Sequence, residues 1–515
     1  MGSEHFVATL ALVGIVIVAA ALLSGAVERS GLPQVAIFLL VGVALGPSGL
    51  GLLDIGLESP TLQVISTVGL VLVLFSDAIA ADVPEIRRRR RLALLILGPG
   101  TLGPAVLIAL AAWLLLGVGA ASAAILGAAL ASTDPVLLRN LLRHRSVPAT
   151  TKLALRLESG MNDVVLLPVV VLAMLALASQ KEIVSGAEVA RHVVGLFLLG
   201  PALGAAVGWL GITVLDRVRR GYGVRRDYES LYALGLALTA YAAAEGVGGS
   251  GFLAAFAAGL VVVMLDVELC DCFLDYGEAS AEMFLLLTFV AFGTGPIWRG
   301  LAVVEWRTLV FVAVALGVRT AVLYPVLARA GVERGDRALI AWFGPRGLSS
   351  LLLVLLPVFA GVPGADYLFG VASLVVIVSV VLHGGGIAVQ LQRMTRGDDA
   401  ATITGTTATV AVPGARARPP RAALPQAATP AGDNGRETAA AAAAARTPET
   451  ITLDEVRELE TRGEAVVIVD ARTARSRDGD RLQARGSVRI PPDDAVRSAR
   501  AIGLAQHATL VVYCA

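Results

Sequence analysis

Long apolar stretches recur along most of this chain and constrain its fold more than any other feature. About thirteen segments of roughly 17 or more predominantly apolar residues occur before residue 397, each long enough to cross a bilayer. Because lipid offers the backbone no hydrogen-bond partners, such segments cross as helices. The sequence therefore predicts an all-α polytopic membrane protein. The predicted spans lie near residues 6–27, 32–50, 61–80, 92–117, 121–142, 151–179, 192–215, 229–247, 251–269, 280–297, 301–328, 337–360 and 366–390.

Composition excludes several classes of protein. With 56% hydrophobic residues in 515 and a mean hydropathy of +0.75, the chain is too apolar to be a soluble protein of this length. The net charge of +1 gives no basic excess that would favour nucleic acid as a partner. Three cysteines rule out a disulfide framework, and the five histidines lack the spacing of metal ligands. We therefore expect the lipid bilayer as surroundings and no cofactor.

The distribution of arginine over the loops predicts the orientation. With the N-terminus placed outside, the inner loops hold most of the positive charge, including the run Arg87–Arg91. The outer loops hold only Lys181, Arg191, Arg299 and Arg307. By the positive-inside rule, we expect a multi-pass protein of the cell membrane with its N-terminus outside and its C-terminus in the cytoplasm.

A polar stripe interrupts the sixth predicted span, in the sequence LESGMNDVVLLP. At helical spacing, Glu158 and Asn162 are i,i+4 neighbours, as are Ser159 and Asp163, so the four side chains share one face. Ionisable groups at membrane depth face a bundle interior or an aqueous cavity and mark ion or proton paths. The stripe therefore predicts an ion-binding site. The alternative is a structural hydrogen-bond cluster between helices.

A second polar interruption lies near the middle of the fifth span, in ALASTDPVLL. Pro135 lacks a backbone donor, and its ring disfavours a helical conformation at Asp134. We therefore expect an unwound segment whose carbonyl groups, with Thr133 and Asp134, face an ion. The alternative is a proline kink in which Asp134 caps the second half-helix. The two interpretations are compatible.

Three further charged residues lie inside predicted spans: Asp77 in the third, Arg319 in the eleventh and Arg346 in the twelfth. A buried arginine requires a carboxylate partner. Glu158 and Asp163 are the natural candidates for Arg346. We expect a structural Glu158–Arg346 ion pair that leaves Asp163 free to titrate. The alternative is that Arg346 extends from a helix end to the membrane interface.

The order of three intramembrane motifs resembles that of cation:proton antiporter family 1, the NhaP-like and eukaryotic sodium/proton exchangers. The motifs are Thr-Asp-Pro at 133–135, Glu-Ser-x-x-Asn-Asp at 158–163 and Gly-Pro-Arg-Gly-Leu at 344–348. The resemblance covers about residues 6–394. It implies an inverted-repeat fold with unwound crossing helices, a homodimer, and electroneutral exchange of Na⁺ for H⁺.

The resemblance also implies roles for single residues. Asp163 is implied to carry the cation and the proton in turn, with Asn162 as its neighbour. The further cation contacts implied are Thr133, Asp134, Ser159 and Asp77, the last at a position where related proteins often carry Glu.

Competition of a proton and a cation for one buried carboxylate couples their fluxes if the site crosses the membrane only when neutralised. Oxygen ligands fit Na⁺, Li⁺ or K⁺ and give no reason to expect a transition metal. A K⁺/H⁺ antiporter of the same fold is therefore the first alternative. An ion channel is the second, although a selectivity filter favours rings or repeated motifs over one carboxylate stripe.

The composition changes after this transmembrane domain of residues 1–396. Residues 397–448 have no apolar periodicity and contain an alanine run, as is typical of a flexible linker. Residues 449–515 have helical spacing from about Thr450, followed by strand patterns in AVVIVDAR and ATLVVYCA. This alternation predicts a small partial α/β domain.

The C-terminal pattern resembles a rhodanese domain. In that family a strand ends in Asp-x-Arg, here Asp470 and Arg472, and a later strand delivers a sulfur-carrying cysteine, here Cys514. There the cysteine begins a loop that forms the anion pocket. Because the sequence ends at Ala515, before such a loop, we expect no sulfurtransferase activity. The alternative role is a tail that reports sulfur or redox state to the transporter.

Overall fold

The structure, a computed structural model, describes most of residues 34–390 and parts of the C-terminal region. It does not describe residues 82, 144–146, 180–185, 223–225, 266–270 and 388–389. Outside 34–390 it describes residues 14, 15, 17, 18, 22, 466–471, 484, 487–490, 498, 499, 502 and 509–513. The chain divides into two compact units, Met1–Val410 and Ala411–Ala515, and each is described by itself.

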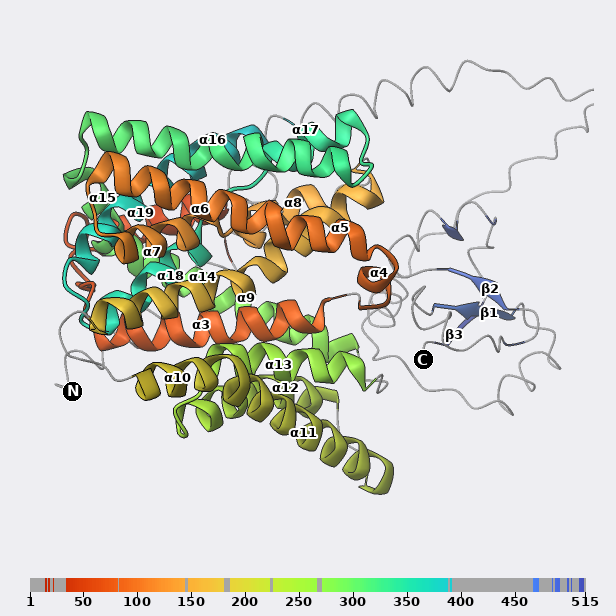
Figure 1. Ribbon diagram of the computed structural model, residues 1–515. Coiled ribbons are helices and arrows are strands. Elements are labelled where there is room, and N and C mark those ends of the chain that lie inside the picture. The colour runs from red at the N-terminus through yellow and green to blue at the C-terminus, as the bar shows by residue number, and fades with distance from the viewer. Residues whose placement is uncertain are drawn as a thin grey trace, which may run out of the picture. The chain divides into compact units, whose positions relative to one another are not determined.

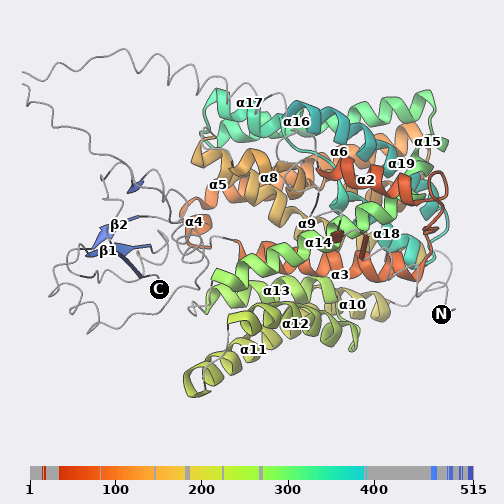
Figure 2. The ribbon, with the colours of Figure 1, turned by 180° about the vertical axis from the view of Figure 1, so that it is seen from behind.

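The first unit is built of helices alone over its described residues, most of them running side by side (Figures 1 and 2). Its first half contains α2 (Gln34–Leu45), α3 (Pro60–Ile79), α4 (Val83–Arg88), α5 (Arg90–Leu95), α6 (Thr101–Ala111), α7 (Ala120–Ala131), α8 (Pro135–Arg143), α9 (Ala149–Ser179) and α10 (Gly186–Val194). Its second half contains α11 (Gly200–Tyr222), α12 (Arg226–Glu245), α13 (Gly251–Met264), α14 (Asp271–Thr294), α15 (Arg299–Ala302), α16 (Trp306–Arg329), α17 (Arg334–Trp342), α18 (Leu348–Phe359) and α19 (Ala365–Ser379).

Short segments of other helix types continue several of these helices. The π-helical segments η1 (Ile96–Gly100), η2 (Ala112–Leu116), η3 (Gly195–Leu199) and η5 (Val380–Gly384) follow α5, α6, α10 and α19. A 3₁₀ turn, η4 (Pro296–Trp298), precedes α15. Because α5, η1, α6 and η2 form one continuous run, they account for the fourth predicted span.

Among the described residues, seven helical runs are long and apolar enough to cross a membrane, and eight if Ala279–Thr294 and Pro296–Ala302 form one bent span. Four shorter apolar helices cover Gln34–Leu45, Leu231–Glu245, Gly251–Met264 and Leu348–Phe359. The predicted all-α membrane architecture is confirmed. The first predicted span, near 6–27, lies almost wholly outside the described residues, so the count of thirteen stays a prediction.

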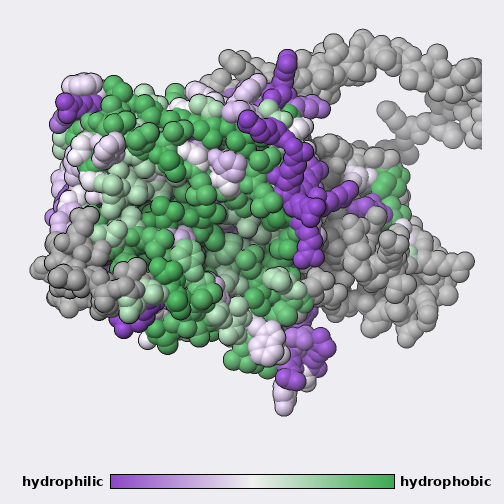
Figure 3. Space-filling model, in the orientation of Figure 1, coloured by the Kyte–Doolittle hydropathy of each residue, from purple (hydrophilic) through white to green (hydrophobic). Residues whose placement is uncertain are grey.

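Small residues allow the helices to pack closely, as is usual in membranes. Gly204 and Gly208 of α11 lie against Ala254 and Ala258 of α13, and a Cβ atom on Gly208 would lie 2.9 Å from the Cα of Ala258. Leucine, valine and tryptophan side chains cover much of the outer surface, and hydrophilic residues gather at the helix ends (Figure 3). The helical unit therefore presents an apolar belt suited to lipid.

The second unit contains a parallel sheet with strand order β2-β1-β3. Strands β1 (Val466–Asp470) and β3 (Thr509–Tyr513) confirm the two predicted strands, whereas β2 (Val488–Arg489) was not predicted. Asp470 ends β1 and is buried, and its carbonyl oxygen accepts a hydrogen bond from the backbone of Ile490 at 3.1 Å. Arg472, Cys514 and the predicted linker lie outside the described residues.

Candidate ion-binding site

The fifth span breaks where the sequence predicted. Helix α7 ends at Ala131, and α8 begins at Pro135. Between them the backbone of Ser132 is extended, with φ −61° and ψ 141°. Pro135 starts α8 without needing an amide donor, which is the position in a helix where proline is tolerated. The break leaves the polar side chains of residues 132–134 buried in the middle of the helical unit.

A second break lies opposite the first. Helix α17 ends at Trp342 and α18 begins at Leu348, so the motif around Arg346 is not helical. The two breaks meet directly, because the backbone amide of Asp134 donates to the carbonyl oxygen of Pro345 at 2.9 Å. Figure 1 shows α7, α9 and α18 between α16 and α11, in the interior of the helical unit. Two interrupted helices therefore cross at the site, as the resemblance implied.

The carboxylate of Asp134 caps a helix on each side of this crossing. Its Oδ1 accepts from the amide of Val136 at 2.8 Å, and its Oδ2 accepts from the amide of Leu348 at 2.7 Å. A Cβ atom on Gly347 would collide with the same carboxylate, so only glycine fits there. The negative charge compensates the positive ends of α8 and α18. The capping alternative for Asp134 is thus confirmed, and the cap extends to a second helix.

Arg346 places a positive charge at the C-terminal end of α7, whereas Asp134 places a negative charge at the N-terminal ends of α8 and α18. Its side chain is 1% exposed, and its NH1 donates to the carbonyl oxygens of Ala131 at 2.9 Å and Ser132 at 3.0 Å. These carbonyls end α7, where the helix dipole is negative. The predicted Glu158–Arg346 ion pair is therefore wrong, because Arg346 binds a helix end instead. The alternative, an extension to the membrane interface, is also wrong, because the side chain is buried.

Glu158 pairs with Arg319 of α16. Nε of Arg319 lies 2.6 Å from Oε1 of Glu158, and NH2 lies 2.5 Å from Oε2, which makes the pair bidentate. The remaining nitrogen, NH1, donates to the carbonyl oxygen of Ala341 at 2.6 Å. Gly344 leaves room for this guanidinium, since a Cβ atom there would overlap it. Arg319 thus joins α9 and α17 to α16, and both charges are buried.

The polar stripe of α9 faces inward, as predicted, because Glu158, Ser159, Asn162 and Asp163 are all buried. Nδ2 of Asn162 donates to the hydroxyl oxygen of Thr133 at 2.9 Å. The hydroxyl of Ser132 donates to the carboxylate of Asp163. The stripe therefore contacts the first break through two side-chain hydrogen bonds.

Two other predicted residues lie beside the stripe. The hydroxyl of Ser159 donates to the carbonyl oxygen of Leu155 at 2.8 Å, which leaves its lone pairs as acceptors. Asp77 of α3 lies next to Gly160, where a Cβ atom would be 3.7 Å from its Oδ1. Asp77 is half-buried, so it stands at the edge of the site.

One buried acceptor in the site has no hydrogen-bond partner among the described residues. It is Oδ1 of Asn162, a residue with no exposed surface. A buried polar atom without a partner is costly, and binding a water molecule or a cation would satisfy it. Asn162 and Asp163 both contact the first break, through Thr133 and Ser132, so their oxygens together offer hard donors and one negative charge at this break. Such a set suits an alkali cation.

The sequence did not point to three serines that complete the crossing. Ser379 of α19 accepts from the backbone amide of Arg346 at 2.7 Å, and Ser350 donates to the carbonyl oxygen of Ser132 at 3.4 Å. Ser349 lies close to the carboxylate of Asp163. Ser349 and Ser350 directly follow the third motif, which was an available signal. Ser379 is one hydroxyl in an apolar run and gave none.

Comparison with known proteins places the helical unit in a family. The family model described as "Sodium/hydrogen exchanger, transmembrane" matches residues 15–393. The K(+)/H(+) antiporter NhaP2 of Shewanella sp. (strain ANA-3) is 29% identical over 382 residues, covering 71% of this chain and 63% of the relative. The Na(+)/H(+)-K(+) antiporter GerN of Bacillus cereus is 22% identical, covering 68% of this chain and 89% of GerN.

A solved structure shares the fold. The sodium proton antiporter MjNhaP1 of Methanocaldococcus jannaschii superposes with a TM-score of 0.59, at 16% identity, over 73% of this chain and 98% of that chain. The chain matches less than two thirds of the length of NhaP2. The antiporter fold of the helical unit is thereby shown.

Proposed function

Because this chain belongs to the sodium/hydrogen exchanger family, we propose that it exchanges a monovalent cation for protons across a membrane. One observation carries the proposal: where two interrupted helices cross, α9 places the buried carboxylate of Asp163 directly after Asn162, whose Oδ1 has no hydrogen-bond partner among the described residues. A carboxylate in this position accepts either a proton or a cation. In this proposal the chain acts as a secondary transporter and needs no cofactor.

Competition at Asp163 couples the two fluxes. The carboxylate binds one proton or one cation, and the loaded, neutral site is the form that changes its exposure from one side to the other. Asn162 adds an oxygen ligand without adding a charge. Each cycle then moves one positive charge in each direction, so the exchange is electroneutral.

The surrounding residues divide into ligands and supports. We assign Thr133 and Ser159 as further oxygen contacts and Asp77 as a contact at the edge of the site. Asp134 acts mainly through the helix ends, because both of its carboxylate oxygens already accept backbone amides. Its negative charge still favours a cation nearby.

We propose Na⁺ as the transported cation. The ligand set fits Na⁺ and also Li⁺. K⁺ is the second candidate, and one observation favours it: the relative that is 29% identical is named a K⁺/H⁺ antiporter, whereas the structure named a sodium proton antiporter is 16% identical.

A flux assay on purified protein in proteoliposomes tests the proposal. Na⁺, Li⁺ and K⁺ are added separately, and proton release is followed with a pH-sensitive dye for the wild type and for Asp163→Asn. Asp366→Asn is the matched control, since Asp366 is an exposed carboxylate on α19, paired with Arg299 at 3.3 Å. We expect cation-triggered proton release in the wild type and the control, and none in Asp163→Asn. Equal flux in Asp163→Asn and the wild type would remove Asp163 from the carrier role.

The oligomeric state, membrane and orientation of the chain belong to the same proposal. We infer a homodimer in the cell membrane, with the arginine-rich helix ends in the cytoplasm. With the native cysteines replaced by serine, single cysteines introduced in the Arg87–Arg91 segment and after Arg299 would be labelled by an impermeant maleimide from opposite sides. Labelling of both from the same side would refute the orientation. Mass photometry in nanodiscs would report whether the chain is a dimer.

A further inference from the structure

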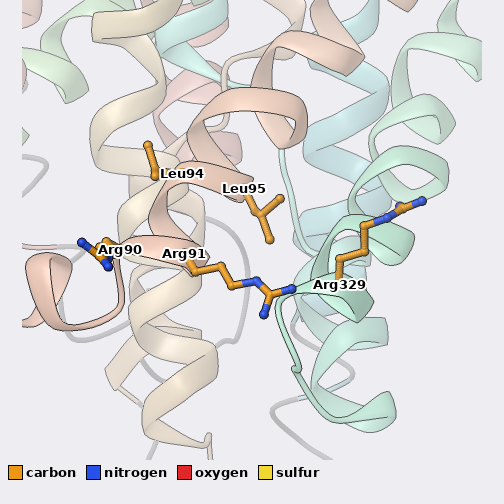
Figure 4. Close-up of a pocket in the computed structure, with 5 residues that line it drawn as sticks. All are labelled: Arg90, Arg91, Leu94, Leu95 and Arg329. Atoms are coloured by element: carbon orange, nitrogen blue, oxygen red, sulfur yellow. The ribbon is translucent and has the colours of Figure 1, made fainter.

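An open pocket of about 510 Å³ lies between α5 and α16, outside the ion-binding site. Its lining consists of Arg90, Arg91, Leu94 and Leu95 from α5 and Arg329 from the last turn of α16. Figure 4 shows Arg91 extending from α5 toward α16, with Leu94 and Leu95 farther along the helix. The transport mechanism proposed above uses none of these residues.

The positive charge of this pocket is not balanced within the described part of the chain. In the arginine run, Glu85 pairs with Arg89 at 2.6 Å and with Arg88 at 4.0 Å. No described carboxylate forms an ion pair with the three arginines of the pocket, which are Arg90, Arg91 and Arg329. Figure 4 shows the guanidinium group of Arg91 between the two helices, with those of Arg90 and Arg329 on either side and pointing away from it. Three like charges on adjacent helix ends, with no described carboxylate paired to them, attract an anion to this edge of the helical unit.

The pocket changes from charged to apolar within one helical turn. Arg90 and Leu94 are i,i+4 neighbours on α5, as are Arg91 and Leu95, so each arginine lies about 6 Å along the helix from a leucine on the same face. Leu94 is 70% exposed, whereas Leu92 is buried in the core. Since α5 leads into a predicted span, Leu94 faces the lipid belt, and the arginines lie at its edge.

We propose that this pocket binds an anionic phospholipid, with its phosphate on the arginines and an acyl chain along Leu94 and Leu95. Guanidinium groups match phosphate oxygens in a bidentate geometry. Basic pockets between membrane helices are suited to such headgroups. The exposed leucine favours a lipid over a free phosphate ion, which would leave the apolar half of the pocket unused.

Native mass spectrometry of the full chain in detergent, titrated with phosphatidylglycerol, phosphatidylcholine or inorganic phosphate, tests this. The variant is Arg91→Gln/Arg329→Gln. The matched control is Arg217→Gln/Arg220→Gln, which removes two arginines from the end of α11 at the same end of the bundle as the pocket (Figure 1). We expect phosphatidylglycerol to bind about tenfold or more weakly to the variant, within twofold of wild type to the control, and phosphatidylcholine to bind equally to all.

A second variant addresses the apolar half without removing charge. Because Leu94 is exposed, Leu94→Gln leaves the core intact, and we expect it to weaken phosphatidylglycerol binding while leaving phosphate binding unchanged. Unaltered phosphatidylglycerol binding in Arg91→Gln/Arg329→Gln would overturn the site. An equal loss in the α11 control would show general surface attraction instead. Displacement of phosphatidylglycerol by millimolar inorganic phosphate would show a site for free anions and overturn the lipid assignment.

Discussion

The buried Glu158–Arg319 pair predicts a specific pattern of stability among five variants, three single and two double. Arg319→Gln removes two charged hydrogen bonds, at 2.6 and 2.5 Å, and leaves the carboxylate of Glu158 buried without a counter-charge. Breaking such a pair from one side costs about 3–5 kcal/mol. Glu158→Gln leaves Arg319 buried without its carboxylate partner. It is expected to lower the free energy of unfolding by a similar amount, reduced by the hydrogen bond that Arg319 keeps to Ala341.

The double variant Glu158→Gln/Arg319→Gln removes both charges together. Replacing a buried ion pair by neutral groups is often close to neutral, so the double variant is expected to be no less stable than either single variant. The coupling energy is therefore at least about 3–5 kcal/mol. Arg346 makes no ion pair with Glu158, so the cycle of Glu158→Gln with Arg346→Gln should give a coupling below about 1 kcal/mol.

Thermal unfolding in one detergent, followed by tryptophan fluorescence for wild type, the three single variants and the two double variants, measures both cycles. Comparing differences between cycles cancels most effects of detergent. A larger coupling for Glu158 with Arg346 than with Arg319 would refute the assignment of the pair. Additive losses in both cycles would show that neither arginine balances Glu158.

Three further perturbations follow from the crossing. Asp134→Ala removes two helix caps and is expected to cost about 2 kcal/mol of stability in the same unfolding assay. Asp366→Ala, at an exposed ion pair, should change the stability by less than about 0.5 kcal/mol. Equal losses in the two variants would argue against the double cap. Gly347→Ala places a methyl group against the Asp134 carboxylate and should lower the unfolding temperature. Gly235→Ala, in open space on α12, should leave the unfolding temperature unchanged or raise it. An unchanged unfolding temperature in Gly347→Ala would count against the tight crossing. Asn162→Asp adds a charge to the site and should make proton flux in proteoliposomes depend on an imposed membrane potential, and flux that stays independent of potential would oppose the role given to Asn162.

The sequence was sufficient to predict features that depend on local chemistry. Apolar length predicted the helices, and helical spacing placed Glu158, Ser159, Asn162 and Asp163 on one buried face. Pro135 predicted the first break, since the effect of a proline on its own backbone does not depend on distant parts of the chain.

Pairing between distant segments was harder to predict. Arg346 stands in a conspicuous motif, and the expectation that it pairs with Glu158 treated a carboxylate as the only partner a buried arginine accepts. Carbonyl groups at the end of α7 serve the same purpose, and they become available only when the helix is broken. Which of two arginines reaches Glu158 is decided by the packing of α16 against α9 and α17. Spacing along the chain does not contain that information.

The balance of fixed charge at the crossing has a consequence for the electrical work of transport. Among the described residues there, Asp134 and Arg346 oppose each other at the helix ends, and Glu158 and Arg319 oppose each other in a pair, so these four sum to zero. Displacing one elementary charge through a potential of 100 mV costs about 2.3 kcal/mol. The scaffold can therefore shift within the membrane field at little electrical cost, and Asp163 with its bound proton or cation decides whether the step is sensitive to voltage.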